Sequence, residues 1–316
     1  LHRLLQLRQA AGQPIRTLLL ENVDRLINSP TACRGRDFAI ILSSLQALGY
    51  AVAWQVVNAG DYGFAQRRKR IFITAVHASA PEWRQWQQAQ ADPQAWLTKV
   101  SPLTRALPVC ASGELRTFTL GRDVLDTQAN FQPGNGGKSQ FANAGLCSGG
   151  QVWTLPTQAL SLTDYTDFVG QGAPLTLGDV VQGTTAVPEG FFLNEAHLGR
   201  WEYLKGAKRI ERVSATGHAY TYGEGAMAFP DALDKASRTV ITGEGGAAAS
   251  RTKHVVRHAD GRLRRLTPDE LEVLNGFPRG FTGALGVTDV KRAFLMGNAL
   301  VTGVVARIGM AMAECC

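Results

Sequence analysis

Hydrophobic and polar positions alternate in blocks over the first part of the chain. Residues 15–20 form a short apolar run that ends at the polar pair Glu21-Asn22, which is typical of a buried strand leading into a loop. Residues 36–48 place apolar side chains on one helical face, followed by a Gly stop signal. Two more apolar runs predict strands, at residues 51–57 and 70–76. The order of strand, helix and strand predicts the edge of a doubly wound α/β sheet.

The pattern changes twice further along the chain. Residues 79–117 are partly helical and end in a polar connector, whereas residues 118–257 are rich in Gly and have only short apolar runs. That composition predicts a second, loop-rich and mostly β domain. Regular patterning returns in residues 258–316, where Thr267-Pro268-Asp269-Glu270 predicts a capping box at the start of a helix. Residues 297–312 predict a buried helix of small and aliphatic side chains.

Length and composition describe a globular protein with a buried core. The chain has 316 residues, 45% hydrophobic and 19% charged, which suits two domains or one large one and argues against a largely disordered chain. The net charge is +7, which is compatible with a polyanionic partner without requiring one. No run of about 18 apolar residues occurs, so a membrane-spanning helix is not expected.

The cysteines and the first residues indicate a cytoplasmic protein. The five cysteines are odd in number, and their spacing fits no zinc pattern, so we expect reduced thiols and no metal site. Residues 1–14 predict a helix rather than a signal peptide. Because the chain opens on Leu1 rather than Met, we expect a fragment or a domain of a longer protein.

Four short segments carry the most specific information. The first is Glu21-Asn22-Val23 at a strand end, and the second is QRRKR, residues 66–70, leading into the next strand. The third joins residues 264–270 (RRLTPDE) to Gly276-Phe277-Pro278, and the fourth is Gly297-Asn298-Ala299. Each is weak alone, but together and in this order they resemble the C-terminal two-thirds of a DNA cytosine-5 methyltransferase.

The resemblance implies a fold class and an activity. Residues 1–78 would form the C-terminal part of a catalytic α/β domain, a partial class I methyltransferase (Rossmann-like) sheet. Residues 118–257 would form the target recognition domain after a connector at 79–117, and residues 258–316 would return to complete the catalytic domain. The implied reaction transfers a methyl group from S-adenosylmethionine to carbon 5 of a flipped cytosine in duplex DNA. Bacterial restriction–modification systems and phages are the implied sources.

The resemblance also implies catalytic residues. Attack of a thiolate on carbon 6 of cytosine is easier when nitrogen 3 of the ring is protonated or strongly hydrogen-bonded. The family gives that role to Glu21, and it places Arg70 near the base O2 and adjacent phosphate, with Arg68 supporting the site. The two arginines are two residues apart in a predicted strand, so we expect them to face the same side. On the residues alone, Glu21 as a capping carboxylate and residues 67–70 as a solvated basic turn remain alternatives.

The fourth segment would close over S-adenosylmethionine. Gly297 and Ala299 flank Asn298, whose amide offers both a donor and an acceptor, and a Gly permits close backbone approach. The alternative is that Asn298 is a buried amide that satisfies a helix end.

Two parts of the family pattern are missing from the chain. The family nucleophile is a Cys after Pro and usually before Gln, and no cysteine here has that setting: Cys33, Cys110, Cys147, Cys315 and Cys316. The Gly-rich loop that opens the cofactor fold should lie about 100 residues before Glu21, at about 30 residues per βαβ unit. We therefore expect the nucleophile and most of the cofactor site to lie elsewhere. The chain would be a fragment, one subunit of a split enzyme whose N-terminal half is a separate chain, or an inactive DNA-binding relative.

Basic residues in the Gly-rich region are candidates for DNA contact, because phosphates and base edges are read from loops. The predicted DNA-binding residues are Lys205, Lys208, Arg209, Arg238, Arg251 and Lys253, with Arg212 and His254 as further candidates. The alternative is that they are solvated surface charges. A subunit acting on RNA is a second alternative function, although the Cys-Phe-Thr triplet of the tRNA-methylating branch is absent.

Overall fold

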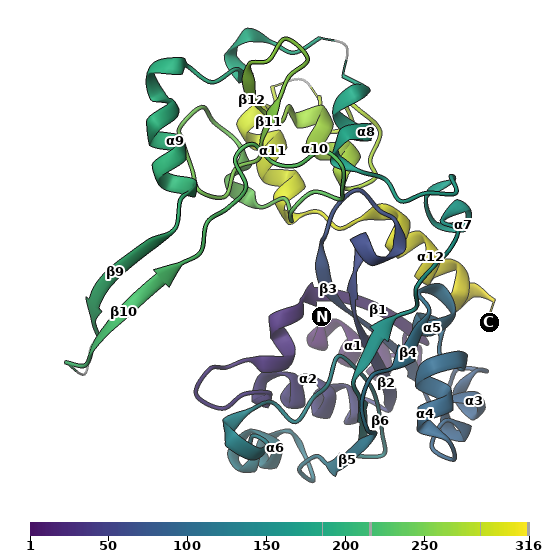
Figure 1. Ribbon diagram of the computed structural model, residues 1–316. Coiled ribbons are helices and arrows are strands. Elements are labelled where there is room, and N and C mark those ends of the chain that lie inside the picture. Colours follow the sequence, from purple (N-terminus) through teal and green to yellow (C-terminus); the bar gives the residue numbers. More distant parts are fainter. Residues whose placement is uncertain (185, 215–216, 285, 315–316) are drawn as a thin grey trace. The chain divides into compact units, whose positions relative to one another are not determined.

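The chain forms two compact units in a computed structural model that describes residues 1–184, 186–214, 217–284 and 286–314 (Figure 1). Unit 1 comprises Leu1–Tyr62, Lys69–Thr163 and the residues from Val304 onward. Unit 2 comprises Gly63–Arg68 and Asp164–Gly303. The chain therefore crosses between the units inside the QRRKR segment, between Arg68 and Lys69.

Unit 1 is built on a six-stranded sheet in the order β1-β3-β2-β6-β7-β5. The strands are β1 (Thr17–Val23), β2 (Tyr50–Asn58), β3 (Lys69–His77), β5 (Arg116–Thr119), β6 (Ala144–Ser148) and β7 (Gln151–Leu155). A second, two-stranded sheet pairs β4 (Val109–Ala111) with β8 (Thr157–Ala159). The helices of unit 1 are α1 (His2–Ala10), α2 (Arg36–Gln46), α3 (Trp83–Gln88), α4 (Pro93–Ala95), α5 (Pro102–Ala106), α6 (Val124–Asn130) and most of α12 (Thr302–Ala313).

The three predicted strands and the helix between the first two are confirmed, and the α/β class with them. The arrangement differs from a simple parallel edge, because β3 lies between β1 and β2 and is antiparallel to both. It follows that β1 and β2 run in the same direction, as a strand–helix–strand crossover through α2 requires. The short Gly-containing link after β2 lets the chain turn back and insert β3.

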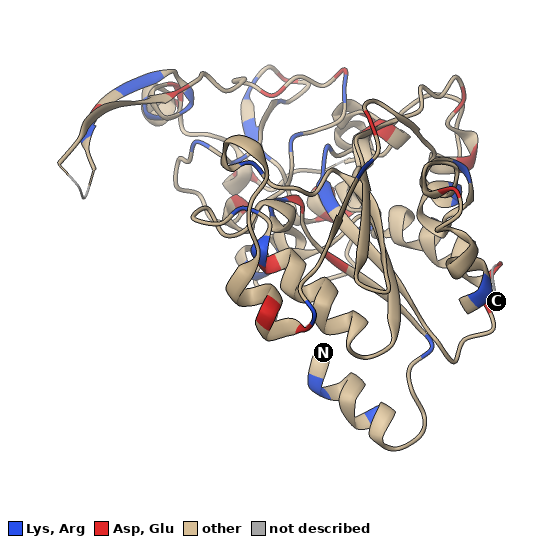
Figure 2. Ribbon diagram, turned by 90° about the horizontal axis from the view of Figure 1, so that it is seen from below, with Lys and Arg blue, Asp and Glu red and all other residues tan. Residues whose placement is uncertain are grey.

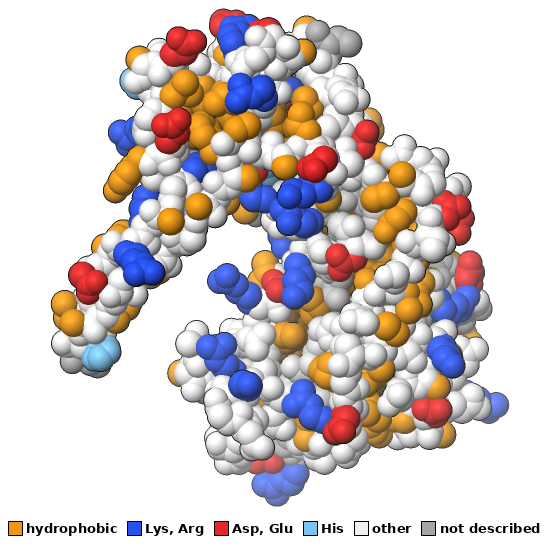
Figure 3. Space-filling model, in the orientation of Figure 1, with side chains coloured by type: hydrophobic (Ala, Val, Ile, Leu, Met, Phe, Trp, Pro, Cys, Tyr) orange, Lys and Arg blue, Asp and Glu red, His pale blue; other side chains and the backbone are white. Residues whose placement is uncertain are grey.

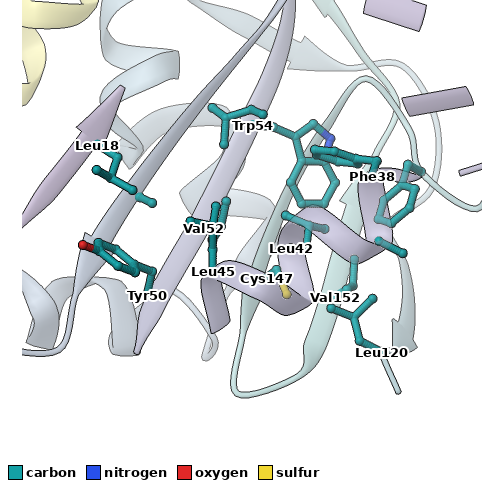
Figure 4. Close-up of a cluster of buried hydrophobic side chains, with 14 of the residues drawn as sticks. Leu18, Phe38, Leu42, Leu45, Tyr50, Val52, Trp54, Leu120, Cys147 and Val152 are labelled. Carbon is teal, nitrogen blue, oxygen red and sulfur yellow. The ribbon is translucent and has the colours of Figure 1, made fainter. Parts of the chain in front are cut away.

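Helix α2 and the sheet enclose the main hydrophobic core of unit 1 (Figure 4). Phe38, Leu42 and Leu45 recur at helical spacing and are almost fully buried. The ring of Phe38 meets Trp54 of β2 edge-on, with ring centroids 5.1 Å apart. A side chain at Gly145 of β6 would lie 2.1 Å from the Trp54 ring, so this packing requires glycine there. The opposite face of the sheet is covered by a second cluster that includes Trp86 and Trp96.

The division between the units differs from the predicted domain boundary at residue 118. Strands β5, β6 and β7 extend the sheet of unit 1. Unit 1 itself continues to Thr163. The Gly density of this stretch arises partly from a tight turn. Gly149 and Gly150 both have positive φ, 58° and 80°, and join β6 to β7. Composition alone does not distinguish short sheet strands with glycine turns from a loop-rich domain.

Unit 2 combines short helices with two separate two-stranded sheets. Its helices are α7 (Thr166–Val169), α8 (Leu177–Gln182), α9 (Leu198–Lys205), α10 (Pro268–Leu274) and α11 (Asp289–Asn298). Its strands are β9 (Lys208–Val213), β10 (Ala219–Glu224), β11 (Val255–Arg257) and β12 (Leu263–Arg265). Apolar side chains from α8, α10, α11 and β11 form its core.

The C-terminal helices test two predictions. The capping box at the start of α10 is confirmed, since Thr267 accepts from the amide of Glu270 and the Glu270 carboxylate accepts from the amide of Thr267. The single helix predicted at 297–312 is wrong, because Gly297-Asn298 end α11 and α12 starts at Thr302. The segment Asp289–Ala313 is long and apolar enough to cross a membrane by length and composition alone. It is interrupted at residues 299–301, and Met296, Val304 and Ile308 are buried within the protein, as in ordinary core helices.

A fully buried ion pair organises the start of α10. Arg264 of β12 donates to both carboxylate oxygens of Glu270, at 2.8 and 2.7 Å, and neither side chain is exposed to solvent. Glu270 also accepts from Thr184, so one carboxylate joins β12, the first turn of α10 and the end of α8. Breaking a buried pair by removing one partner leaves an uncompensated charge.

We predict that Arg264→Leu or Glu270→Gln lowers the free energy of unfolding by about 3–5 kcal/mol, measured by urea denaturation. The matched control is Arg262→Ala, whose guanidinium pairs with exposed Glu189 and Asp260; because solvent screens these pairs, the loss should be clearly smaller. Equal losses in the buried and exposed variants would contradict the role given to the pair.

Candidate active site and nucleic-acid interface

Glu21 and Arg70, the central pair of the sequence prediction, contact each other in unit 1. Arg70 is the second residue of β3 and lies directly opposite Val23 of β1, two residues beyond Glu21. Residues at this diagonal spacing lie on the same face of an antiparallel pair. The Arg70 Nε lies 3.0 Å from Glu21 Oε1, and the two side chains are 16% and 29% exposed. The carboxylate is therefore held by a cation and still accessible from solvent.

Glu21 is among the residues that line a mostly apolar hollow of about 530 Å³. Leu5, Leu20, Leu26 and Ile73 contribute to its walls, and Glu21-Asn22 contribute polar groups. Apolar walls limit the water that can reach an occupant and strengthen its polar contacts. Glu21 does not cap the 3₁₀ helix Asp24–Asn28 that follows it. The N-cap residue of that helix is Val23, and the structure describes no side-chain hydrogen bond at that cap.

Arg68 belongs to unit 2 and has a different environment from Arg70. It precedes the first residue of β3, so the expectation that the two arginines share one strand face is wrong. Its side chain is 3% exposed, and its guanidinium donates to the carbonyls of Val240 and Gly297, at 2.8 and 2.9 Å. These contacts tie the end of α11 to the segment around Val240.

Gln66 is a site residue whose role the sequence did not reveal. Its fully buried amide donates to Leu274 O and to Asn275 Oδ1, both at 3.1 Å, and accepts from the amide of Val240 at 2.8 Å. Asn275 in turn donates to Met296 O. The signal was present in the quoted QRRKR motif, but a motif does not show which backbone groups its side chains will meet.

The segment Gly297-Asn298-Ala299 ends α11. A side chain at Gly297 would lie 2.2 Å from the amide of Thr242, so the close backbone approach expected at this glycine is to the protein itself. Asn298 is exposed and donates to Phe294 O at 3.2 Å, which excludes the alternative of a buried amide. Its outward-facing amide fits one contact to a polar cofactor such as S-adenosylmethionine.

Four of the six predicted DNA-binding cations are bonded inside unit 2. Lys205, 1% exposed, donates to Lys253 O, and Lys253 donates to the carbonyls of Gly246 and Ala248. Arg238 forms a bidentate pair with Asp231 at 2.7 and 3.1 Å. Arg251 donates to carbonyls on both sides of the turn after α9. DNA contact by these four residues stays a prediction, and their burial argues for a scaffolding role.

The two remaining predicted cations differ in exposure. Lys208 lies 4.6 Å from the Tyr203 ring centre, with its side chain 15% exposed, while Arg209 of β9 is exposed. His254, a further candidate, is fully buried and bonded to Glu244 at 2.8 Å. The sequence did not reveal that Asp231 and Glu244 are the buried acceptors of this region, since isolated acidic residues carry no pattern.

The described cysteines do not join the Glu21–Arg70 pair. Cys147 is buried in β6, and burial raises the pKa of its thiol, which favours the protonated form. Cys33 donates to Phe131 O, and Cys110 lies beside Gln158 of β8. Cys315 and Cys316 lie outside the described residues. Among the residues that the structure describes, no group of His, Cys, Asp and Glu side chains could hold a metal ion.

Lys205 gives the scaffold a testable pH dependence. Burial lowers the pKa of Lys205 to about 8; the nearby Asp231 carboxylate opposes this shift, and the Arg238 guanidinium adds to it. An unfolded chain holds this proton up to about pH 10.4, so the contribution of the group to stability is lost as the pH falls through about 8.

We predict that the difference in unfolding free energy between wild type and Lys205→Met shifts in favour of wild type between pH 8 and about 10.4. The expected shift is about 1–3 kcal/mol, since one pKa unit corresponds to about 1.4 kcal/mol. Lys138→Met, on the exposed surface, is the matched control and should show no such shift. A pH-independent difference for Lys205→Met would show that the buried amine does not titrate as described.

Comparisons with known proteins agree with the motif order. The family model described as C-5 cytosine-specific DNA methylase matches residues 12–314. The Type II methyltransferase M.Sau3AI of Staphylococcus aureus is 36% identical over 295 residues, which cover 92% of this chain and 66% of the relative. The Type II methyltransferase M.NlaIV of Neisseria lactamica is 46% identical over 68 residues, 20% of this chain and 16% of the relative.

A solved structure supports the fold. The crystal structure of the S. pombe Dnmt2 methyltransferase matches with a TM-score of 0.50 at 12% identity, covering 98% of this chain and 69% of that chain. At this identity the likeness concerns the α/β fold alone.

Proposed function

Because the chain belongs to the C-5 cytosine-specific DNA methylase family, we propose that it forms part of an enzyme that transfers a methyl group from S-adenosylmethionine to carbon 5 of cytosine in duplex DNA. The chain spans 66% of the length of the M.Sau3AI relative and smaller parts of the others. The proposed setting is a restriction–modification system in the cytoplasm, since the curated relatives include Type II methyltransferases.

The contact between Glu21 and Arg70 is the observation that carries this proposal. A cytosine flipped against this pair would present nitrogen 3 to the Glu21 carboxyl and O2 to the Arg70 guanidinium. Protonation or hydrogen bonding at nitrogen 3 withdraws electrons from the ring, so a nucleophile adds more easily at carbon 6. Arg70 has two tasks in this arrangement, because it fixes the carboxyl at 3.0 Å and offers further N–H donors to the base or phosphate.

The nucleophile is proposed to lie outside these 316 residues. The chain contains no Pro-Cys-Gln segment, and Cys147 is buried with a raised pKa. The M.Sau3AI relative is a single longer chain, which favours a fragment over a separate N-terminal subunit. S-Adenosylmethionine would supply the methyl group, and Asn298 is proposed to contribute one polar contact to it.

Unit 2 is proposed to contain the target recognition domain, beginning at Asp164 rather than at residue 118, and unit 1 to contain the partial class I methyltransferase sheet. Arg68 is proposed to position the Gly297–Ala299 segment through Gly297 O rather than to contact substrate. Arg209 is proposed to contact a phosphate, since it is the exposed one of the predicted cations, whereas Lys208 pairs with Glu224 and donates to Leu204 O.

A methyl-transfer assay tests the proposed function. Duplex DNA and labelled S-adenosylmethionine would be incubated with this chain alone and with the polypeptide encoded immediately upstream. We expect label in DNA only when both are present. Label transfer by this chain alone would contradict the external nucleophile, and DNA binding without transfer in both cases would support the inactive binding protein.

We predict that Glu21→Gln and Arg70→Ala each lower turnover of the complete enzyme by about 10²–10⁴-fold, because each disrupts proton placement at nitrogen 3. DNA affinity should change little, as measured by fluorescence anisotropy. Arg122→Ala is the control, since its side chain is 91% exposed and pairs with Asp126 four residues along the same segment. Turnover at the wild-type rate in either variant would remove that residue from the proposed mechanism.

A further inference from the structure

Strands β9 and β10 form a ribbon that no other strand joins within the described residues. The ribbon extends from the end of α9 and carries several basic side chains (Figures 1 and 2). Every residue of β9 after Lys208 is exposed, and so are four of the six residues of β10. A two-stranded ribbon without a packed face is marginally stable in water. The apolar and aromatic side chains of the ribbon are therefore not accounted for by packing in a hydrophobic core.

The root of the ribbon, where β9 and β10 join the rest of unit 2, is held by several polar contacts, whereas the remainder of the ribbon is exposed. Arg251 donates to Leu204 O and Gly206 O, at 3.1 and 3.0 Å, and pairs with Glu224 at 3.4 Å. The same Glu224 lies 4.0 Å from Lys208. These contacts fix the direction in which the two strands leave α9. Arg251 and Lys208 thus anchor the ribbon to the end of α9.

The two faces of the β9–β10 ribbon carry different kinds of side chain. Directly paired residues share a face, which places Ile210 and Tyr222 with Arg212 and Tyr220. We name these four residues the aromatic face. The Arg212 guanidinium lies 4.1 Å from the Tyr222 ring centre. The opposite face carries Arg209, Val213, Ala219 and the hydrogen-bonded pair Glu211–Thr221.

Charge complementarity favours a polyanion as the partner of the aromatic face. In the part of the chain that the structure describes, neither Arg212 nor Arg209 has a carboxylate within 4.0 Å. The acidic residue on this side of the ribbon is Glu224 at the root, and it is already paired with Lys208 and Arg251. Glu211 lies on the opposite face. Figure 3 shows basic and hydrophobic side chains along the ribbon. Arg, Tyr and an apolar side chain together can bond to base edges, stack and contact thymine methyl groups.

We propose that the ribbon enters the major groove of duplex DNA with its aromatic face toward the base edges. The strands of such a ribbon lie about 4.8 Å apart. The major groove, about 12 Å wide, admits a two-stranded ribbon. Arg212 and Tyr220 read bases, and Arg209 contacts phosphate from the other face. This inference rests on the proposed function, because it takes duplex DNA as the substrate.

Binding of the 316-residue chain to a labelled duplex of mixed sequence, followed by fluorescence anisotropy over a series of salt concentrations, tests the proposal. Arg212→Ala and Tyr220→Ala should each weaken binding about tenfold or more. Arg209→Ala removes the same charge as Arg212→Ala but from the opposite face, so it should weaken binding only about two- to threefold. Thr221→Ala is the uncharged control on that face and should leave binding unchanged. Thermal melting verifies folding, which these exposed positions should not affect.

The outcomes separate this proposal from the proposed function. If the wild-type chain binds duplex DNA and Arg212→Ala and Tyr220→Ala bind within about twofold of it, the ribbon is not the docking surface, although the proposed function stands. Equal losses for Arg212→Ala and Arg209→Ala would overturn the assignment of the aromatic face. If the wild-type chain binds no duplex DNA, the ribbon proposal fails, while the methyl-transfer assay with the upstream polypeptide decides the proposed function separately. If the variants instead abolish self-association, measured by light scattering, the face belongs to a second copy.

Discussion

The short segment from Gln66 to Arg70 is the constraint on which both units depend. Gln66 and Arg68 are buried in unit 2, where they bond to Leu274, Asn275, Val240 and Gly297. Two residues further, Arg70 holds Glu21 across the first two strands of the unit 1 sheet. A buried amide or guanidinium that loses its acceptors costs free energy, so each of these contacts fixes the segment's path. The same five residues therefore shape the proposed cofactor segment and the candidate catalytic pair.

Buried cations substitute for regular secondary structure in unit 2. Lys205, Lys253 and Arg251 donate to backbone carbonyls of Gly-rich loops, and Arg264 donates to Glu270 beneath α10. Long loops leave carbonyls without a helical or strand partner, and long cationic side chains reach and satisfy them. The positive charge of this sequence is thus partly internal. The surface that can meet a nucleic acid is smaller than the net charge of +7 suggests.

The sequence predicted local secondary structure well, but it did not predict which residues distant in the chain contact each other. The strands β1 to β3, helix α2 and the capping box of Thr267 and Glu270 follow from residues close together in the chain. Glu21 and Arg70 were identified through the family motif, but their contact was not predicted, because it depends on the register of strands whose residues lie 49 positions apart in the chain. The burial of Lys205 and Arg68 was not predicted, because the identity of a basic residue does not show whether its side chain will contact a backbone carbonyl or a phosphate. The inserted position of β3 and the extension of the sheet by β5, β6 and β7 likewise depend on pairing that composition does not encode.

The central claim is that Glu21 and Arg70 act on a cytosine whose carbon 5 receives the methyl group. The most direct measurement uses duplex DNA with tritium at carbon 5 of cytosine, incubated with S-adenosylmethionine and this chain together with the polypeptide encoded upstream. Methylation at that carbon must displace its hydrogen. The account predicts release of tritium into water in proportion to methyl groups incorporated. Methyl incorporation without tritium release would place the methyl group on another atom and contradict the account.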